Sequence, residues 1–164
     1  MRCSASIERR WARGMMLLGL LLMLMLSSIA LMGAAEVWST TRQHEQESEL
    51  LFVGTQYQQA IRRYYYAAPS GKARMLPARL ENLLSDDRFD VPVHHLRRLY
   101  PDPVTGSSDW GLVLVDDRIA GVHSPSDARP LKQTGFAPAQ AGFEAKSSYK
   151  EWVFLFMPPR SARK

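Results

Sequence analysis

The fold of this 164-residue chain depends on one stretch, LLFVGTQYQQAIRRYYYAA, residues 50–68. Its apolar and aromatic side chains recur at three- and four-residue steps, which is the spacing of one face of an α-helix. The members of this stripe are Leu50, Val53, Tyr57, Ile61 and Tyr64. Proline and glycine at 69–71 end the helix. Because an amphipathic helix buries its apolar face, the stretch predicts a small domain packed against this stripe.

The same helix is expected to extend far upstream. Residues 36–49 are polar but contain neither glycine nor proline, so nothing in them obliges a helix to stop. The sequence therefore predicts one long helix over roughly residues 15–67. Gly54 costs about 1 kcal/mol relative to alanine inside a helix, so it indicates a bend or a close packing contact.

The first part of this helix is uncharged. Residues 15–35, MMLLGLLLMLMLSSIALMGAA, form an apolar run of 21 residues. At about 1.5 Å per residue such a helix is about 30 Å long, the thickness of the hydrocarbon core of a bilayer. The preceding arginines favour a cytoplasmic N-terminus, and Trp38 lies where an interfacial aromatic residue is favoured. We therefore expect a single-pass membrane protein with residues 36–164 outside the cytoplasm.

A cleaved signal peptide remains an alternative for this segment. The apolar core of a signal peptide is usually about 7–15 residues long, which is shorter than the run observed here. The small residues Gly33, Ala34 and Ala35 nevertheless offer a site for signal peptidase, and cleavage there would leave Glu36 as the first residue.

Charge and cysteine content exclude several classes of protein. The net charge is +5, but residues 1–14 contribute +3 of it, and the rest of the chain is nearly neutral at +2. The sequence has no basic stripe with interleaved aromatic residues, so we do not expect a nucleic-acid partner. The single cysteine, Cys3, precedes the apolar run, so an internal disulfide cannot stabilise the exported domain.

The second half of the chain changes from helical to strand-like patterns. Two short helical segments are expected, at 78–87 (ARLENLLSDD) and at 93–99 (VHHLRRL). Residues 110–115 and 119–123 are strand-like runs joined by a turn at 116–118, which predicts a hairpin. Residues 124–142 are rich in Pro, Gly, Ser and Ala and are expected to form a loop, and 149–156 (YKEWVFLF) has the composition of a third strand.

Together these patterns predict an α+β fold, in which a long N-terminal helix packs on a small antiparallel sheet of about three strands. The expected domain organisation has four parts. They are a basic cytoplasmic leader (1–14), a transmembrane helix (15–35), an exported domain (36–159) and a disordered tail (160–164).

No group of residues forms a convincing active site or cofactor site. His94 and His95 are adjacent and lack the spacing of a metal set, so a surface or packing role is favoured for them. Asp102, Asp109 and the Asp116-Asp117 pair lie in or near turns, where calcium binding and simple turn chemistry are alternatives and the second is favoured. Ser124 and Ser126 lack the setting of a hydrolase nucleophile. In the triple tyrosine 64–66 the side chains face different ways, and at least one of them should be in the core.

Several stretches resemble one known family. The basic leader that ends in glycine resembles that of type IV pilin-like proteins, and specifically the pseudopilins of type II secretion systems. Four further runs look like segments of the same proteins: ELLFVGTQYQQAIRRYY (49–65), HLRRLYPDPVTGSSDWGLV (95–113), GVHSPSDARPLK (121–132) and YKEWVFLFMP (149–158). The resemblance implies a pilin-like fold in a single-pass protein of a bacterial inner membrane, with the C-terminal domain in the periplasm. It also implies that a prepilin peptidase would cut after Gly14, which leaves Met15 as the first residue of the mature chain.

The leader departs from the family at one position. Pseudopilins typically carry a glutamate as the fifth mature residue, where it is thought to pair with the N-terminal amine of a neighbouring subunit. Counted from Met15, the fifth residue here is Gly19. This departure removes one device that sets the register between subunits.

The function expected from the sequence is therefore assembly rather than catalysis. A pseudopilin-like protein would associate with other pseudopilins and with inner-membrane secretion components, without a metal or cofactor. Small residues that permit close helix packing in a membrane are Gly19, Ser27, Ser28, Gly33 and Ala34. A membrane-tethered periplasmic binding or accessory module outside any filament is the first alternative, and a small exported enzyme is the second.

Overall fold

The computed structural model describes residues 5–159, and within the long helix it describes the side chains of residues 16–28 and of residue 38 onward. Helix α1 comprises Ala5–Tyr66. The other elements are the 3₁₀ helices η1 (Leu80–Leu83), η2 (Pro138–Phe143) and η3 (Tyr149–Glu151) and the strands β1 (Gly111–Val115), β2 (Arg118–His123) and β3 (Phe154–Leu155). The chain divides into two compact units, Met1–Arg42 and Gln43–Lys164.

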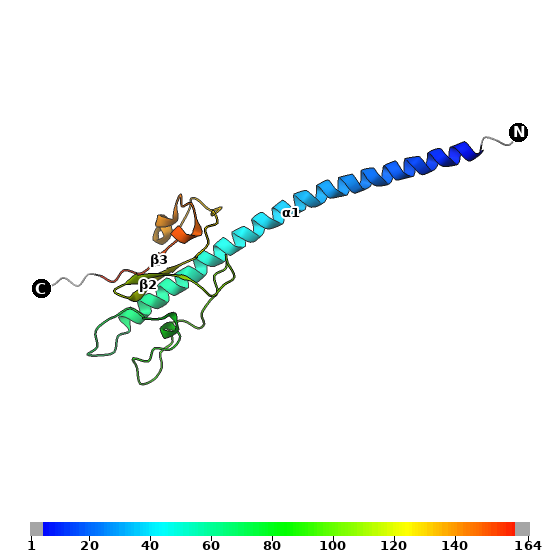
Figure 1. Ribbon diagram of the computed structural model, residues 1–164. Coiled ribbons are helices and arrows are strands. Elements are labelled where there is room, and N and C mark those ends of the chain that lie inside the picture. Colours follow the sequence, from blue (N-terminus) through cyan, green and yellow to red (C-terminus); the bar gives the residue numbers. More distant parts are fainter. Residues whose placement is uncertain (1–4, 160–164) are drawn as a thin grey trace. The chain divides into compact units, whose positions relative to one another are not determined.

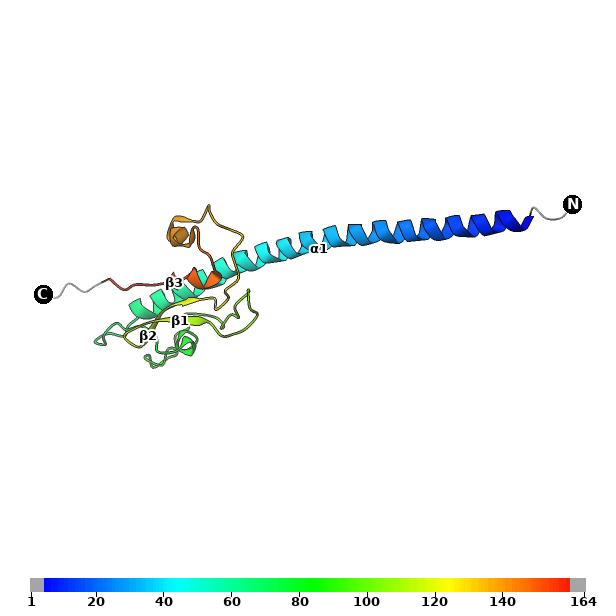
Figure 2. The same ribbon diagram turned by 45° about the horizontal axis from the view of Figure 1, so that its top comes forward.

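The predicted class of fold is confirmed, because the second unit combines the C-terminal part of α1 with a three-stranded antiparallel sheet. The strand order is β1-β2-β3. Figures 1 and 2 show the sheet running beside the cyan-to-green part of α1. The hairpin turn is Asp116-Asp117, and both residues have positive φ, 51° and 57°. That geometry matches the twist of the flanking strands and is tolerated by aspartate.

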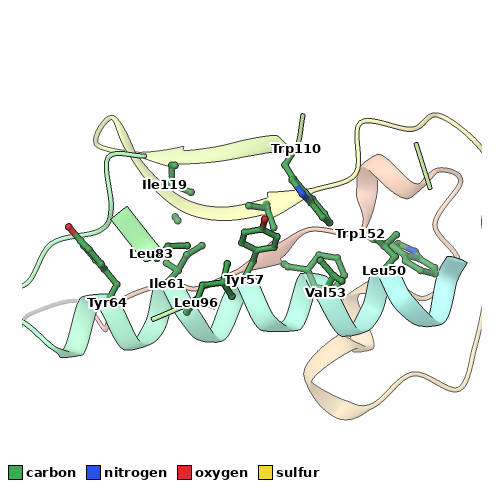
Figure 3. Packing of buried hydrophobic residues seen from close by; sticks show 14 of the residues in the cluster. Leu50, Val53, Tyr57, Ile61, Tyr64, Leu83, Leu96, Trp110, Ile119 and Trp152 are labelled. Carbon is green, nitrogen blue, oxygen red and sulfur yellow. The ribbon is translucent and has the colours of Figure 1, made fainter. Parts of the chain in front are cut away.

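The core lies between α1, the connector 67–110 and the sheet. All five residues of the predicted helical stripe are buried, with exposed fractions of 5% or less. Figure 3 shows them pointing from α1 toward Leu83, Leu96, Trp110, Ile119 and Trp152. The amphipathic pattern of residues 50–64 therefore predicted the buried face correctly.

Gly54 is a packing contact, which is one of the two roles predicted for it. It is buried in α1, and a Cβ added there would overlap the side chain of Phe154. The missing side chain thus lets β3 lie against the helix.

One prediction of local structure was wrong, and two were right only in part. Residues 93–99 are not helical: Val93 forms an isolated bridge with Asp86, and the backbone amides of His95 and Leu96 both donate to the carbonyl of Leu83. Tertiary hydrogen bonds hold this segment in an irregular, non-helical conformation. The helix predicted at 78–87 is only η1, and the strand predicted at 149–156 is reduced to β3, because η3 precedes it.

Helix α1 also begins earlier than predicted, at Ala5. Within the residues that the structure describes, no helix is long and apolar enough to cross a membrane. Met15 and residues 29–35 of the apolar run belong to the part of α1 whose side chains are not described, and the predicted tail 160–164 and Cys3 lie outside the described residues.

Candidate functional site

Three buried carboxylates are the most distinctive polar features of the second unit. Glu47, Asp86 and Asp102 are exposed by only 2%, 1% and 0%. A buried carboxylate is costly unless it is paired or hydrogen-bonded, so each must be explained by its partners. Each one lies where a long loop meets another part of the domain.

Asp86 is paired with two basic side chains of the connector. The guanidinium of Arg88 donates from Nε to Oδ1 at 2.8 Å and from Nη2 to Oδ2 at 2.6 Å, and Nε2 of His95 lies 3.1 Å from Oδ2. Burial acts to raise the pKa of Asp86, but the hydrogen bonds and charge of Arg88 and the hydrogen bond of His95 outweigh it. The pKa of Asp86 is therefore held below its usual value.

Arg88 links this cluster to the C-terminal end of α1. Its Nη2 also donates to the carbonyl oxygen of Tyr64 at 2.7 Å, and its guanidinium carbon lies 3.7 Å from the centre of the Tyr64 ring. The carbonyls of the last helical turn lack partners within the helix, so a cation is favourable there. Arg88 thus fixes the connector 67–110 to the C-terminal end of α1, and Asp86 holds its guanidinium in place from within the connector.

Glu47 is held by neutral donors. Its Oε1 accepts the backbone N–H of Leu131 at 2.5 Å and the hydroxyl of Tyr149 at 2.9 Å, and both of its oxygens lie 3.3 Å from the N–H of Lys132. Gln43 donates to the same hydroxyl at 3.0 Å and to the carbonyl of Arg129 at 3.0 Å. Burial, above all, raises the pKa of Tyr149 to about 12, and the hydrogen bond to Glu47 adds to this effect. This cluster fixes the segment 124–149 to α1.

Asp102 fixes a turn to the sheet. Its carboxylate accepts the N–H of Val104 at 3.1 Å, the hydroxyl of Thr105 at 2.8 Å and the hydroxyl of Ser124 at 2.7 Å. These bonds confirm turn chemistry for Asp102. Asp109, Asp116 and Asp117 are exposed. In the part of the chain that the structure describes, no group of three or more His, Cys, Asp or Glu residues could hold a metal ion.

The arrangement of these groups suits attachment rather than reaction. Ser124 is fully buried, and its hydroxyl is used in the bond to Asp102. His95 is buried against Asp86, as the predicted packing role requires, whereas His94 is exposed and its Nδ1 contacts the carbonyl of Leu84. The three tyrosines face different ways as predicted, with Tyr64 buried, Tyr65 half-buried and Tyr66 exposed.

The residues predicted to pack in a membrane belong to the first unit. A Cβ added at Gly19 would meet no atom outside its own helix, and Ser27 and Ser28 are exposed. The two serine hydroxyls donate back to the carbonyls of Met23 at 2.8 Å and Leu24 at 2.9 Å. Gly14, Met15, Gly33 and Ala34 lie outside the residues whose side chains are described.

Glu47 and Asp86 were not predicted from the sequence. For Glu47 the sequence did contain a signal. It lies three residues before Leu50, so it is on the same face of the helix as the apolar stripe. Asp86 stands beside Asp87 in the sequence, and nothing in that pair distinguishes the buried residue from the exposed one.

Comparisons of this chain with protein-family models, with curated proteins and with solved structures find no match.

Proposed function

We propose that this chain is a non-enzymatic, pseudopilin-like component of a type II protein secretion system. Its N-terminal helix would anchor it in the bacterial inner membrane with the N-terminus in the cytoplasm. Its C-terminal domain would lie in the periplasm with a pilin-like fold. The partners would be other pseudopilins and inner-membrane secretion components.

One observation carries this proposal. The C-terminal part of α1 buries its apolar stripe against a small antiparallel sheet, and the same helix contains, nearer its N-terminus, an uncharged run of 21 residues that starts after Gly14. An uncharged helix of that length suits a bilayer, and a stripe on its continuation suits a small domain. This order of parts is what the resemblance to pseudopilins implies.

The mechanism would be assembly through the helix. Helix association in membranes depends on close packing, for which Gly19, Ser27, Ser28, Gly33 and Ala34 supply small residues. The hydroxyls of Ser27 and Ser28 are already hydrogen-bonded to α1 itself. Since a polar group in hydrocarbon is costly only when it is unsatisfied, these serines are compatible with a lipid environment.

A membrane-tethered accessory module is the second candidate, and Gly19 is the observation that favours it. A pseudopilin typically has a glutamate at this position, and a carboxylate within a membrane is retained for a function. Without it, a protein could be anchored in the same way and never enter a filament.

The deciding experiment is the intact mass of the protein from its native membrane, with and without the prepilin peptidase. A mature chain that begins at Met15 only when the peptidase is present supports the proposal. A chain that begins at Glu36 indicates signal peptidase and defeats it, and an uncut chain favours the tethered module.

Two variants sharpen this measurement. Gly14→Leu should abolish the peptidase-dependent cut, whereas Gly19→Ala, a matched change at the next glycine, should leave it intact. Crosslinking of the processed protein to the major pseudopilin then tests filament membership, and its absence favours the accessory module.

A further inference from the structure

The two edges of the sheet differ in how they are covered. At one edge, β3 is only two residues long, and the side-chain amide of Gln58 on α1 donates to the carbonyl of Leu155 at 2.7 Å. At the other edge, β1 is five residues long and pairs only with β2. In the described part of the chain, no other backbone or side-chain group is hydrogen-bonded to the backbone of β1. The outer edge of β1 is therefore open to a further strand.

The side chains of β1 do little to prevent such pairing. Natural proteins usually protect an open edge with charged residues or proline, and Gly111–Val115 (GLVLV) contains neither. The one protective device is an irregularity of the pairing between Val113 and Leu114. Leu112 and Leu114 point to the same side of the strand and are 44% and 55% exposed. Both the backbone and the side chains of β1 thus offer contacts to a partner.

The ends of β1 are acidic. Asp109 precedes the strand and Asp116 and Asp117 follow it, and all three are exposed. None of them forms an ion pair with a described residue. The nearest cation in sequence, Arg118, donates from Nη1 to the carbonyl of Leu76 at 2.9 Å. An extended segment along β1 would therefore meet negative charge at both of its ends.

We propose that the outer edge of β1 binds an extended segment of another protein, in which about five largely apolar residues are flanked on both sides by lysine or arginine. Main-chain hydrogen bonds to β1 would supply the affinity. Leu112 and Leu114 would contact alternate apolar side chains, and the three aspartates would select the basic flanks. This inference does not depend on processing at Gly14.

The charges also argue against a second copy of this chain as the occupant. Two β1 strands paired antiparallel about a two-fold axis would bring Asp109 of each copy near Asp116 and Asp117 of the other. Like charges placed opposite one another are unfavourable. A basic partner avoids this repulsion, and its positive charges are attracted to the three aspartates.

The test uses the full chain in detergent and a fluorescent peptide, Lys-Lys-Val-Thr-Val-Thr-Val-Lys-Lys, followed by fluorescence anisotropy. The peptide should bind, the binding should weaken with salt, and amide hydrogen exchange should slow within residues 111–115. A matched peptide with glutamate in place of each lysine should bind at least about tenfold more weakly.

Variants of exposed residues distinguish binding at β1 from nonspecific binding. Leu114→Lys should weaken binding of the basic peptide by about tenfold or more, because it adds charge repulsion at the edge. Asp116→Asn with Asp117→Asn should weaken binding and reduce its salt dependence, and asparagine tolerates the positive φ of this turn. The matched control is Leu131→Lys, since Leu131 is also exposed (40%) but lies outside the sheet, and it should leave binding unchanged.

Three results would overturn the proposal. They are no binding of the basic peptide, equal binding of the acidic peptide, and equal loss of binding with Leu131→Lys. Self-association of the chain that Leu114→Lys abolishes would instead assign the edge to a second copy, which also contradicts the proposal.

Discussion

Attachment of two long segments to α1 depends on a buried carboxylate in each case, but with different chemistry. The connector 67–110 is attached through Arg88, which donates to the carbonyl of Tyr64 and is held by the carboxylate of Asp86. The segment 124–149 is attached through Glu47, whose close partners are neutral N–H and O–H groups. The nearest basic group to Glu47 is the exposed His44, with Nδ1 3.9 Å from Oε2. A charged attachment leaves a buried cation behind when the carboxylate is removed, and a neutral attachment leaves only unpaired donors. The first should therefore be the more costly to break.

The largest effect is expected from Asp86→Ala. Removal of this carboxylate leaves the largely buried guanidinium of Arg88 with only the carbonyl of Tyr64 as acceptor, and the buried ring of His95 without its partner. Loss of one partner of a buried ion pair costs about 3–5 kcal/mol of unfolding free energy. Chemical denaturation of the full chain measures this loss. Asp87→Ala at the exposed neighbouring residue is the control and should change stability little. A loss below about 1 kcal/mol for Asp86→Ala would show that water replaces the pair.

Acid should act on the same attachment. The pKa of Asp86 is lower in the folded protein than its ordinary value of 3.8, so its stabilising contribution is complete above that value. The contribution is lost as the pH falls through the lower pKa of the folded state. The stability difference between the wild type and Asp86→Asn should therefore shrink as the solution is acidified below about pH 3.8. A difference that stays constant would mean that Asp86 is already protonated at neutral pH.

The next effect is expected from Glu47→Ala, which breaks the neutral attachment. The backbone amides of Leu131 and Lys132 and the hydroxyl of Tyr149 would lose their acceptor. Water can reach part of this segment, so we expect a loss of about 2–3 kcal/mol, smaller than for Asp86→Ala. Amide hydrogen exchange should quicken at Leu131 and Lys132. The exposed Glu49→Ala is the matched control on the same helix. A cost equal to that of Asp86→Ala would refute the distinction between charged and neutral attachment.

The third effect concerns packing in place of hydrogen bonding. Gly54→Ala adds a methyl group that must displace the ring of Phe154, the first residue of β3. Alanine is intrinsically better than glycine in a helix by about 1 kcal/mol, so a net loss of about 1–2 kcal/mol would show that the overlap outweighs that gain. Gly142→Ala is the control, because a Cβ there meets no atom. Stabilisation by Gly54→Ala would mean that β3 moves away from α1 at little cost.

How far the sequence predicts this molecule depends on whether the deciding contacts are local. The helix stripe and the hairpin follow from spacing and turn residues that lie close together in the chain, and both were predicted correctly. The non-helical form of 93–99 depends on contacts with Leu83 and Asp86, and the close approach of β3 to α1 depends on the contact between Phe154 and Gly54. Such contacts join residues from different elements, so local patterns do not reveal them.

The same reasoning applies to the buried carboxylates. Asp102 was recognised as a turn residue because it lies between Pro101 and Pro103, and two of its partners, Val104 and Thr105, are also close in sequence. The partners of Glu47 lie more than eighty residues away, at Leu131 and Tyr149. No sequence spacing encodes that contact, although the position of Glu47 at the end of the apolar stripe does indicate that it is partly covered.

The smallest effect is expected from Tyr149→Phe. Its pH dependence should differ from that of Asp86→Asn. The change removes the hydrogen bonds that the hydroxyl forms with Glu47 and Gln43, and because Gln43 keeps its bond to the carbonyl of Arg129, the change should cost about 1 kcal/mol below pH 10. Tyr149 has a pKa of about 12 in the folded protein against 10.0 ordinarily, so its contribution is complete below pH 10 and is lost as the pH rises through about 12. The wild type should therefore lose its advantage over Tyr149→Phe in alkali, whereas its advantage over Asp86→Asn is lost in acid. Tyr66→Phe at an exposed tyrosine is the control and should show no such dependence. A stability difference between the wild type and Tyr149→Phe that persists above pH 12 would mean that the phenol does not ionise in the folded state. The hydrogen bond between Tyr149 and Glu47 would then remain intact in alkali.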